Sequence, residues 1–436
     1  MMKIAGKIKI LLVMLLANVI FSVNSYCEEK TLTLEECLSA ADKSNFELTS
    51  QQYKIKETNS KYNQEVSNLL PQIDASLSYL RYDWQLPSKK ALFGASLDDY
   101  YADISLKQIL YAGGKYIARI DSSQSALAAE KDKYEQTKST VYLSVKKSYY
   151  EQVRAQFALK TQNKLFEKLN DQFKVAQLLY NSGKTTNLDV LRIQTQLAAA
   201  EDTIDNLRNL VYTKSLLLGQ VMGKNEPVNA SSVYLPEIRE NIKINTTCLD
   251  NEFKNNPELK YADNLVKKSE YDITVESGEM FPTVFFRANY SWEDQTFFPG
   301  NSNWYVGLGL SLPIYHGGAI ASRIEQAAYR NKQLVEAQKQ LKLGLSVRFQ
   351  SARATVIDKT NRLKTTKKVL DLSREALIAA ELRYNAGKTT ATELLDAQTV
   401  WLNSELNYFN NIVDVIISLA EIENICPDAF ASEVVK

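Results

Sequence analysis

The sequence predicts a mixed α and β membrane protein in which long coiled-coil helices alternate with pairs of antiparallel β-strands. Three observations predict this fold. Glycine and proline, which interrupt regular structure, number only 15 and 9 in 436 residues. Apolar residues recur at every seventh position over long segments. Finally, the order of motifs in the first half of the chain is repeated in the second half.

Composition narrows the classes of function. Lys plus Arg number 52 and Asp plus Glu number 51, so the chain lacks the basic excess of a nucleic-acid-binding protein. His316 is the single histidine, which argues against a His-based catalytic triad or a multi-histidine metal site. We also find no phosphate-binding loop and no nucleophile motif. We therefore expect no enzyme activity, no catalytic residues, no cofactor, no metal site and no nucleic-acid partner.

The segment 1–25 has the pattern of a secretory signal peptide. Three lysines precede an apolar run at 10–21, and Val23 and Ser25 supply the small residues of a cleavage site. An uncleaved N-terminal anchor is the alternative. No other segment approaches ~18 consecutive apolar residues, so the sequence predicts export without a spanning helix.

Disulfide bonds are expected because exported chains meet oxidising conditions. The chain has four cysteines, at Cys27, Cys37, Cys248 and Cys426. Four cysteines can pair in three ways, and the sequence leaves these alternatives open.

Two pairs of motifs indicate an internal repeat. Residues 180–186 (YNSGKTT) recur as 384–390 (YNAGKTT), and residues 111–114 (YAGG) recur as 315–318 (YHGG), both at an offset of 204. Upstream, Pro71 matches Pro282 at the larger offset of 211. The first copy therefore has seven more residues than the second between this proline and its Gly-Gly motif. Insertions fall in loops, which predicts a loop there. Copies this long indicate two pseudo-symmetric half-subunits rather than a solenoid.

Each copy is predicted to contain a very long helix and a second helix after it. The segments 114–180 and 318–384 hold no proline, and 67 residues of helix would extend about 100 Å. The segments 187–222 and 391–424 carry a seven-residue apolar period, which predicts left-handed coiled-coil packing. The period consists of Val190, Leu197, Ile204, Val211 and Leu218 in the first copy and of Leu394, Trp401, Tyr408, Val415 and Ile422 in the second.

Strand hairpins are predicted at about 72–111 and 283–315, where apolar and polar residues alternate. Alternation over about ten residues is typical of outer-membrane barrel strands, although a half-buried sheet in a soluble protein shows it too. Trp292 and Trp304 near strand ends favour the membrane alternative. The residues predicted to face lipid are Leu77, Tyr79, Leu106, Phe286, Tyr290, Leu308 and Leu310.

These strands predict an assembly of several chains. Four strands cannot close a barrel, and open sheet edges cannot face lipid. Three protomers would supply twelve strands, within the known range of barrels. The predicted organisation is a signal peptide at 1–25, a first repeat at 26–222, an equatorial linker at 223–250, a second repeat at 251–424 and a C-terminal tail at 425–436.

The ordered motifs resemble the TolC family of outer membrane efflux proteins over essentially the whole mature chain. The resemblance rests on the two Gly-Gly motifs and on the two hairpin motifs, the second followed by LLDAQ at 394–398. It implies a homotrimer with a twelve-stranded β-barrel in the lipid of the cell outer membrane and an α-helical barrel extending into the periplasm. It further implies a channel-tunnel, the passive exit duct of a tripartite efflux pump or type I secretion system. The implied partners are a periplasmic membrane-fusion adaptor and an inner-membrane transporter of RND, ABC or MFS type.

The resemblance also implies a periplasmic aperture formed by Tyr384, Glu393 and Asp396. Glu393 and Asp396 are three residues apart and so share one helix face. Under threefold symmetry they would form a ring of six carboxylates, which favours cations. The alternative is that acidic residues at a helix start simply favour the macrodipole. Tyr384 matches a latching tyrosine, whereas Thr389 stands where the family often has arginine.

Gly183, Lys184, Gly387 and Lys388 mark the hairpin tips predicted to dock the adaptor, and a capped helical turn is the alternative explanation. The rival prediction for the whole chain is a periplasmic coiled-coil structural or adaptor protein of an envelope complex. That class would carry one hairpin and modules rich in Gly and Val. The duplicated strand pairs favour the channel.

Overall fold

The structure is a computed structural model that describes residues 31–84, 97–231, 244–295, 297, 300–427 and 429. The predicted signal peptide, Cys27, most of the predicted insertion loop and most of the C-terminal tail lie outside the described residues. Contacts divide the chain into two compact units. Unit 1 consists of Met1–Asn45, Ser144–Glu237 and Asn361–Ile417, and unit 2 consists of Phe46–Leu143, Ile238–Thr360 and Ser418–Lys436.

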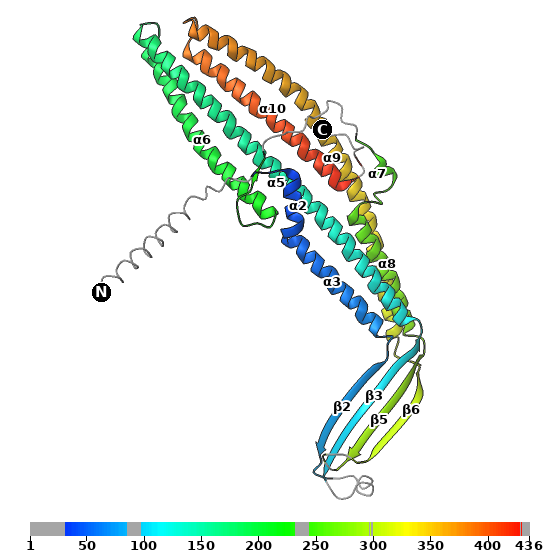
Figure 1. Ribbon diagram of the computed structural model, residues 1–436. Coiled ribbons are helices and arrows are strands. Elements are labelled where there is room, and N and C mark those ends of the chain that lie inside the picture. The colour runs from blue at the N-terminus through cyan, green and yellow to red at the C-terminus, as the bar shows by residue number, and fades with distance from the viewer. Residues whose placement is uncertain are drawn as a thin grey trace, which may run out of the picture. The chain divides into compact units, whose positions relative to one another are not determined.

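Long helices and short strands alternate along the chain (Figure 1). The first half contains β1 (Thr31–Leu32), α2 (Leu34–Ser44), α3 (Phe46–Ser67), β2 (Gln72–Arg81), β3 (Asp98–Ala112), α5 (Lys115–Asn181), α6 (Asn187–Val221) and β4 (Asn229–Ala230). The second half contains α7 (Thr247–Asp250), α8 (Pro257–Gly278), β5 (Thr283–Asp294), β6 (Ser302–Ser311), α9 (Ala319–Asn385) and α10 (Ala391–Ile425). The predicted mixture of helices with antiparallel strands is therefore confirmed.

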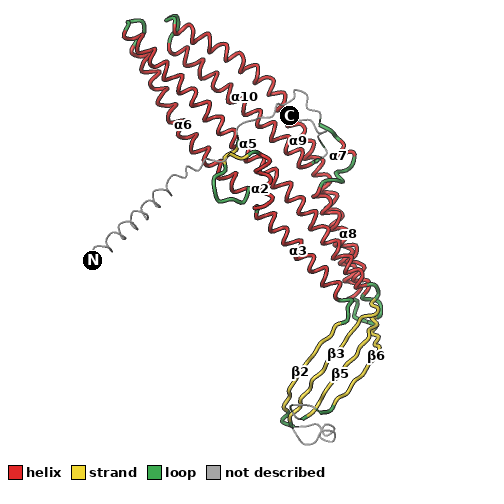
Figure 2. The backbone as a smooth tube through the Cα atoms, viewed as in Figure 1, coloured by secondary structure: helices red, strands yellow, loops and turns green. Residues whose placement is uncertain are grey.

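Unit 2 contains a four-stranded antiparallel sheet in the order β2-β3-β5-β6 (Figure 2). The central pair, β3 with β5, joins a strand of the first half of the chain to one of the second. A register shift between Ile109 and Tyr111 marks a bulge in β3. The edge strands β2 and β6 have one strand neighbour each within the described chain, and their outer backbone groups are open to further pairing.

The register gives the sheet one apolar and one polar face. Partners across a ladder share a face, and the pairs Tyr79↔Tyr100 and Phe286↔Leu308 fall on the apolar one. Following the ladders places all seven residues that the sequence predicts to face lipid on this face. The opposite face is polar: Asp103 there accepts hydrogen bonds from Ser76 and, at 3.1 Å, from Asn289 Nδ2.

In unit 1, α5 with α6 and α9 with α10 form two helical hairpins. The seven-residue period forms their buried seams, because a left-handed coiled coil keeps these positions on one side of each helix. Of the ten period residues, those buried are Val190, Ile204, Leu218, Leu394, Trp401, Val415 and Ile422, the last lying in unit 2. The remaining three are half-buried.

Contacts between the two hairpins of unit 1 include an aromatic pair and an ion pair that join α5 to α10. The rings of Phe157 and Phe409 stack with their centroids 3.6 Å apart. Nearby, Arg154 Nη2 donates to Asp414 Oδ1 at 2.5 Å. The two hairpins therefore pack side by side through aromatic and charged side chains as well as through the seams.

The N-terminal helical segment is broken at Asn45, and the sequence analysis did not anticipate this break. Thr33 begins α2 with a capping box in which the Glu36 carboxylate accepts from the Thr33 backbone. The Asn45 backbone N–H bonds to the carbonyl of Ala41, while its side chain donates to the Val221 carbonyl at 2.8 Å. The asparagine thus ends α2 and attaches it to the end of α6.

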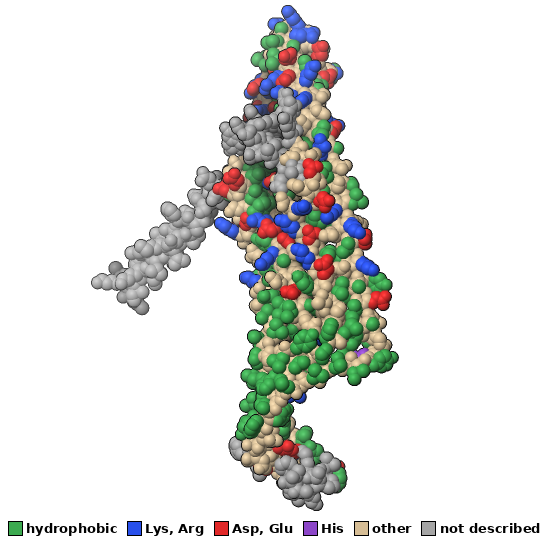
Figure 3. Space-filling view, turned by 90° about the vertical axis from the view of Figure 1, so that its right-hand side faces the viewer, with side chains coloured by type: hydrophobic (Ala, Val, Ile, Leu, Met, Phe, Trp, Pro, Cys, Tyr) green, Lys and Arg blue, Asp and Glu red, His purple; other side chains and the backbone are tan. Residues whose placement is uncertain are grey.

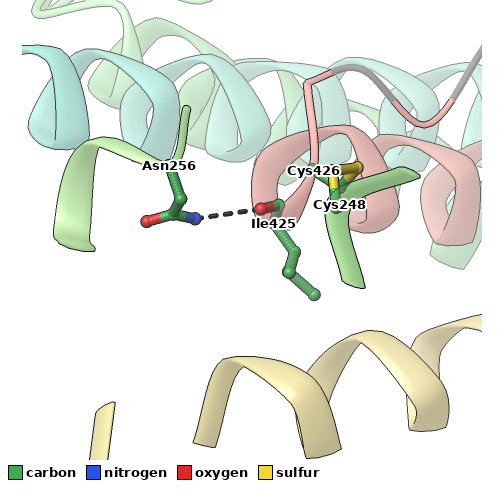
Figure 4. The surroundings of a disulfide bond; sticks show 4 residues. All are labelled: Cys248, Asn256, Ile425 and Cys426. Atoms are coloured by element: carbon green, nitrogen blue, oxygen red, sulfur yellow. Dashed lines mark hydrogen bonds between the residues drawn. A yellow bond between two sulfur atoms is a disulfide. The ribbon is translucent and has the colours of Figure 1, made fainter. Parts of the chain in front are cut away.

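A disulfide joins Cys248 in α7 to Cys426 after α10, both in unit 2, with the Cα atoms 6.1 Å apart (Figure 4). Beside it, Asn256 Nδ2 donates to the Ile425 carbonyl at 2.9 Å, and the carbonyl oxygen of the Asn256 side chain caps α8. The structure thus contains a Cys248–Cys426 bond, while Cys27 lies outside the described residues. Cys37 is a free, fully buried thiol in unit 1.

Apolar side chains gather on the part of unit 2 that carries the sheet and the adjoining helix ends, whereas charges of both signs intermingle over the other helices (Figure 3). Leu77 and Leu308 are 77% and 73% exposed, and Ile314 beyond β6 is 91% exposed. Exposed apolar surface on this scale indicates that another apolar phase or another chain covers it. No helix within the described residues combines the length and apolar character that a membrane crossing requires.

Candidate functional site

The candidate site is the end of unit 1 where both hairpins turn. The first turn has Gly183 at φ 72°, with the Lys184 N–H donating to the Leu179 carbonyl at 2.9 Å. The second has Gly387 at φ 66°, with the Lys388 N–H donating to the Arg383 carbonyl at 2.9 Å. A positive φ followed by such a bond across five residues is the Schellman ending of a helix, which glycine adopts without strain.

Threonines begin the returning helices in the same way. Thr186 Oγ1 accepts from the Asp189 N–H, and Thr390 Oγ1 accepts from the Glu393 N–H, each at 3.4 Å. The side chain of Asp189 is held by the hydroxyl of Thr185, which donates to it at 2.7 Å. Each turn is thus fixed on both sides, and the four tip residues Gly183, Lys184, Gly387 and Lys388 are exposed at its surface.

The two predicted aperture acids lie on the exposed side of the first turns of α10. The Glu393 side chain is 59% exposed, and its Oε1 lies 4.0 Å from Nη1 of Arg383, an equally exposed side chain in the last turn of α9. Asp396 borders an open groove between α10 and α6, together with Leu191, Arg192 and Leu395. Such weakly paired carboxylates remain available to solvent cations.

Tyr384 lies apart from these acids, inside the hairpin core. It is 2% exposed, and its hydroxyl has no hydrogen-bond partner among the described residues. Burial, with a smaller contribution from the negative charge of Asp189, raises the pKa of the Tyr384 phenol. The phenol is therefore neutral in a low-dielectric site, and its hydroxyl, without a partner among the described residues, carries a desolvation cost.

The core beneath the turns draws on all four helices of the two hairpins. Its members are Ala176 of α5, Val190 and Ile193 of α6, Leu377 and Tyr384 of α9, and Ala391, Leu394 and Trp401 of α10. This shared cluster keeps both turns at the same end of the unit. Tip residues and aperture acids are thereby brought together, although they come from opposite halves of the chain.

Two arginines at this end were not singled out by sequence reasoning. Arg192 Nη1 donates to Thr392 Oγ1 at 2.5 Å and so links α6 to α10. The internal repeat could have drawn attention to Arg192, because the offset of 204 places it at the position equivalent to the predicted aperture residue Asp396. Arg383, beside Glu393, occupies the position equivalent to Leu179. Among the described residues, no three His, Cys, Asp or Glu side chains gather as metal ligands would.

Comparison with solved structures identifies the fold. A membrane protein from Pseudomonas aeruginosa superposes with a TM-score of 0.78 at 17% identity, covering 90% of this chain and 93% of that one. The CmeC outer membrane channel of Campylobacter jejuni superposes with a TM-score of 0.78 at 16% identity, covering 92% of this chain and 86% of that one. The open-state MtrE outer membrane channel of Neisseria gonorrhoeae superposes with a TM-score of 0.76 at 15% identity, covering 90% of this chain and 88% of that one.

Comparison with known sequences also matches the chain to outer membrane proteins. The chain is 28% identical to the outer membrane protein TolC of Escherichia coli over 123 residues, which are 27% of this chain and 24% of that protein. It is 22% identical to the outer membrane efflux protein BepC of Brucella suis over 265 residues, 58% of this chain and 53% of that one. These alignments span between about a quarter and a half of the relatives' length. The family profile described as "Outer membrane efflux protein" matches residues 37–224 and 248–426. Since that match covers most of the chain, the protein belongs to the outer membrane efflux protein family.

Proposed function

We propose that three copies of the chain form a channel-tunnel, the passive exit duct of a tripartite efflux pump or type I secretion system. The observation that carries this proposal is the four-stranded sheet with one exposed apolar face and two open edges. Lipid would cover the apolar face, and copies of the same sheet would satisfy the edges. Twelve strands then form one barrel whose polar face lines water.

The hairpins supply the periplasmic part of the duct. Their buried seams and exposed outer faces suit a ring of helices that encloses a water-filled tunnel. In this arrangement Glu393 and Asp396 line the narrow end, with Tyr384 behind them. The tip residues Gly183, Lys184, Gly387 and Lys388 meet a periplasmic membrane-fusion adaptor, which connects the duct to an inner-membrane transporter of RND, ABC or MFS type.

Transport through such a duct needs no catalytic centre in this chain. The energy comes from the inner-membrane partner, and the duct contributes a continuous aqueous path. The acidic end selects charge because carboxylates close to a pore axis attract cations and repel anions.

Fractionation together with electrophoresis tests the proposal. The mature chain is expected in the outer membrane fraction, and an unboiled detergent sample is expected to run as a trimer that boiling converts to monomer. Recovery of a soluble periplasmic monomer would overturn both the barrel and the channel. Chemical cross-linking of intact cells provides an independent measure of the same trimer.

A further inference from the structure

Two cations face each other across the polar face of the sheet. The strands β2, β3, β5 and β6 contain three basic residues, Arg81, Lys107 and Arg287. Lys107 and Arg287 are Cα partners in the β3–β5 ladder, so their side chains share a face, and the register makes it the polar one. Both side chains are exposed. Arg81, by contrast, falls on the apolar face, where its Nη1 lies 3.3 Å from Asp98 Oδ1.

An aromatic side chain holds the two cations together. Phe285 lies two residues before Arg287 on β5 and therefore points to the same face. The centroid of its ring is 5.2 Å from the guanidinium carbon of Arg287 and 5.7 Å from the Nζ atom of Lys107. Both distances are within the reach of a cation–π interaction. The two positive charges thus converge on one ring.

Glycines on the neighbouring strand β6 leave room at this place. Gly309 is the Cα partner of Phe285, and a Cβ at position 309 would overlap the Phe285 ring. Gly307 is the Cα partner of Arg287, and no heavy atom lies within 4 Å of where its Cβ would be. The first glycine therefore accommodates the aromatic ring, and the second leaves open space beside the guanidinium group.

The two cations have no acidic partner. Within the described residues neither Lys107 nor Arg287 forms an ion pair or a side-chain hydrogen bond, and their recorded contacts are those with Phe285. Both lie near the end of the sheet that continues into the helices, because β3 leads into α5 and β5 follows α8 (Figure 2). The acids of the polar face stand progressively further from this end, in the order Asp74, Asp103, Glu293 and Asp99. Charge on this face is thus segregated, with the positive charge next to the helices.

In the barrel of the proposed function this pair becomes a ring. Threefold symmetry repeats each side chain, so that three copies place six cations at one level of the water-lined face. Twelve strands about 4.8 Å apart and tilted by about 40° enclose a barrel about 24 Å across between backbones. The axis is then about 12 Å from the wall, and the long basic side chains extend toward it. A solute on the axis therefore comes within the Debye length of about 8 Å.

We propose that Lys107 and Arg287 of three copies form an oxyanion-binding ring on the water-lined face of the barrel, with Phe285 keeping the two cations at one level. The inference rests on the channel of the proposed function and assigns it a binding site for solutes that carry carboxylate, sulfonate or phosphate groups. A guanidinium group binds such oxyanions through two parallel hydrogen bonds, and an ammonium group adds a point charge. The ring is opposite in sign to the acidic aperture, so the two act on different ions.

Single-channel recording of the full-length trimer in planar bilayers tests the ring. The probe is inorganic tripolyphosphate, added to the chamber that the barrel faces. The parent channel is expected to be blocked in a concentration-dependent way. Lys107→Gln combined with Arg287→Gln should raise the concentration for half block by about tenfold or more, since all six charges of the ring are lost. Lys107→Arg combined with Arg287→Lys keeps these charges and should be blocked like the parent.

Arg81→Gln is the matched control, because it removes a cation from the same sheet but from its apolar face. It should leave the block by tripolyphosphate unchanged. The reversal potential across a KCl gradient gives a second measurement of the same ring. The double glutamine variant should shift it toward stronger preference for cations, whereas the charge-keeping variant and the control should not. Electrophoresis of unboiled samples shows that each variant still assembles.

The outcomes separate this inference from the proposed function. Weaker block in the double glutamine variant alone, with its trimer intact, supports the ring. The inference is wrong if the parent conducts without being blocked, if the double glutamine variant is blocked like the parent, or if Arg81→Gln weakens the block equally; each of these results leaves the channel standing. A parent protein that gives neither a trimer nor a conducting channel overturns the proposed function instead.

Discussion

At the scale of single residues, the two turns use equivalent positions for different purposes. Asp189 and Glu393 stand at the same place in their hairpins, and the backbone of each is capped by a threonine. The carboxylate of Asp189 is 14% exposed and held by threonine hydroxyls, whereas that of Glu393 is 59% exposed. The first acid therefore stabilises its turn, and the second remains open to solvent and to ions.

Replacing Glu393 and Asp396 together by alanine should weaken cation selectivity in planar bilayers. It should also weaken block by divalent or trivalent cations added on the periplasmic side, because the carboxylate ring that attracts them is lost. The yield of trimer should stay the same, since a charge at a helix start contributes about 1 kcal/mol or less.

Asp189→Ala is the matched control for this measurement. It removes a carboxylate from the equivalent position, but the loss should appear as reduced stability of the hairpin, about 1 kcal/mol, rather than as altered selectivity. If the double-alanine variant conducts and is blocked like the parent, the two acids act only at the helix start.

Cys37 should resist alkylation in the folded protein. Burial, followed by repulsion from Glu36, raises the pKa of its thiol from 9.0 to about 11. The unfolded thiol ionises first, so this group's contribution to stability is complete below pH 9 and declines as the pH rises toward 11. Iodoacetamide labelling at pH 8, followed by mass spectrometry, should modify Cys37 only after denaturant is added, and rapid labelling of the native protein would contradict its burial.

At the scale of elements, local rules predict the turns and the strand faces well. Glycine at positive φ and threonine caps are dictated by the chain near Gly183 and Gly387, so the sequence could indicate both turns. The alternating pattern likewise indicates which residues share a face of the sheet. The bulge between Ile109 and Tyr111 and the break at Asn45 depend on distant partners, which explains why the sequence analysis missed them.

Tyr180 and Tyr384 show the limit of motif reasoning. The two tyrosines occupy the same position in nearly identical motifs, yet Tyr180 is 46% exposed and Tyr384 is 2% exposed. The difference arises because Tyr384 packs among residues of all four helices of the two hairpins. Burial of this kind follows from tertiary packing, which a local motif does not contain.

The two faces of β6 provide a paired test of the membrane assignment. Leu308→Arg should impair assembly into the outer membrane, because a charge near the middle of the lipid-facing side costs about 2–4 kcal/mol. Ser311→Arg lies on the polar face of the same strand and should be tolerated. Heat-modifiable trimer in outer membrane fractions measures both variants, and equal damage from the two would show that the faces are assigned to the wrong surroundings.

At the scale of the whole molecule, the disulfide connects segments that are 178 residues apart in the chain. A cross-link over so long a loop restricts the unfolded chain and can stabilise the fold by up to about 5 kcal/mol. Cys248→Ser combined with Cys426→Ser should therefore lower the midpoint of thermal unfolding, followed by circular dichroism. Adding reductant should lower the midpoint of the parent to that of the double variant and leave the double variant unchanged; a parent insensitive to reductant would show that the bond contributes nothing.

The same disulfide also imposes an order on export. Cys27, Cys37 and Cys248 precede Cys426 in the chain and reach the oxidising compartment before it, so the first sulfurs available to Cys248 are the wrong ones. In the folded protein Cys37 is a free, fully buried thiol, so it no longer competes for Cys248. The correct bond can close only after the end of α10 has arrived. Its closure thus marks a chain that has been delivered through residue 426.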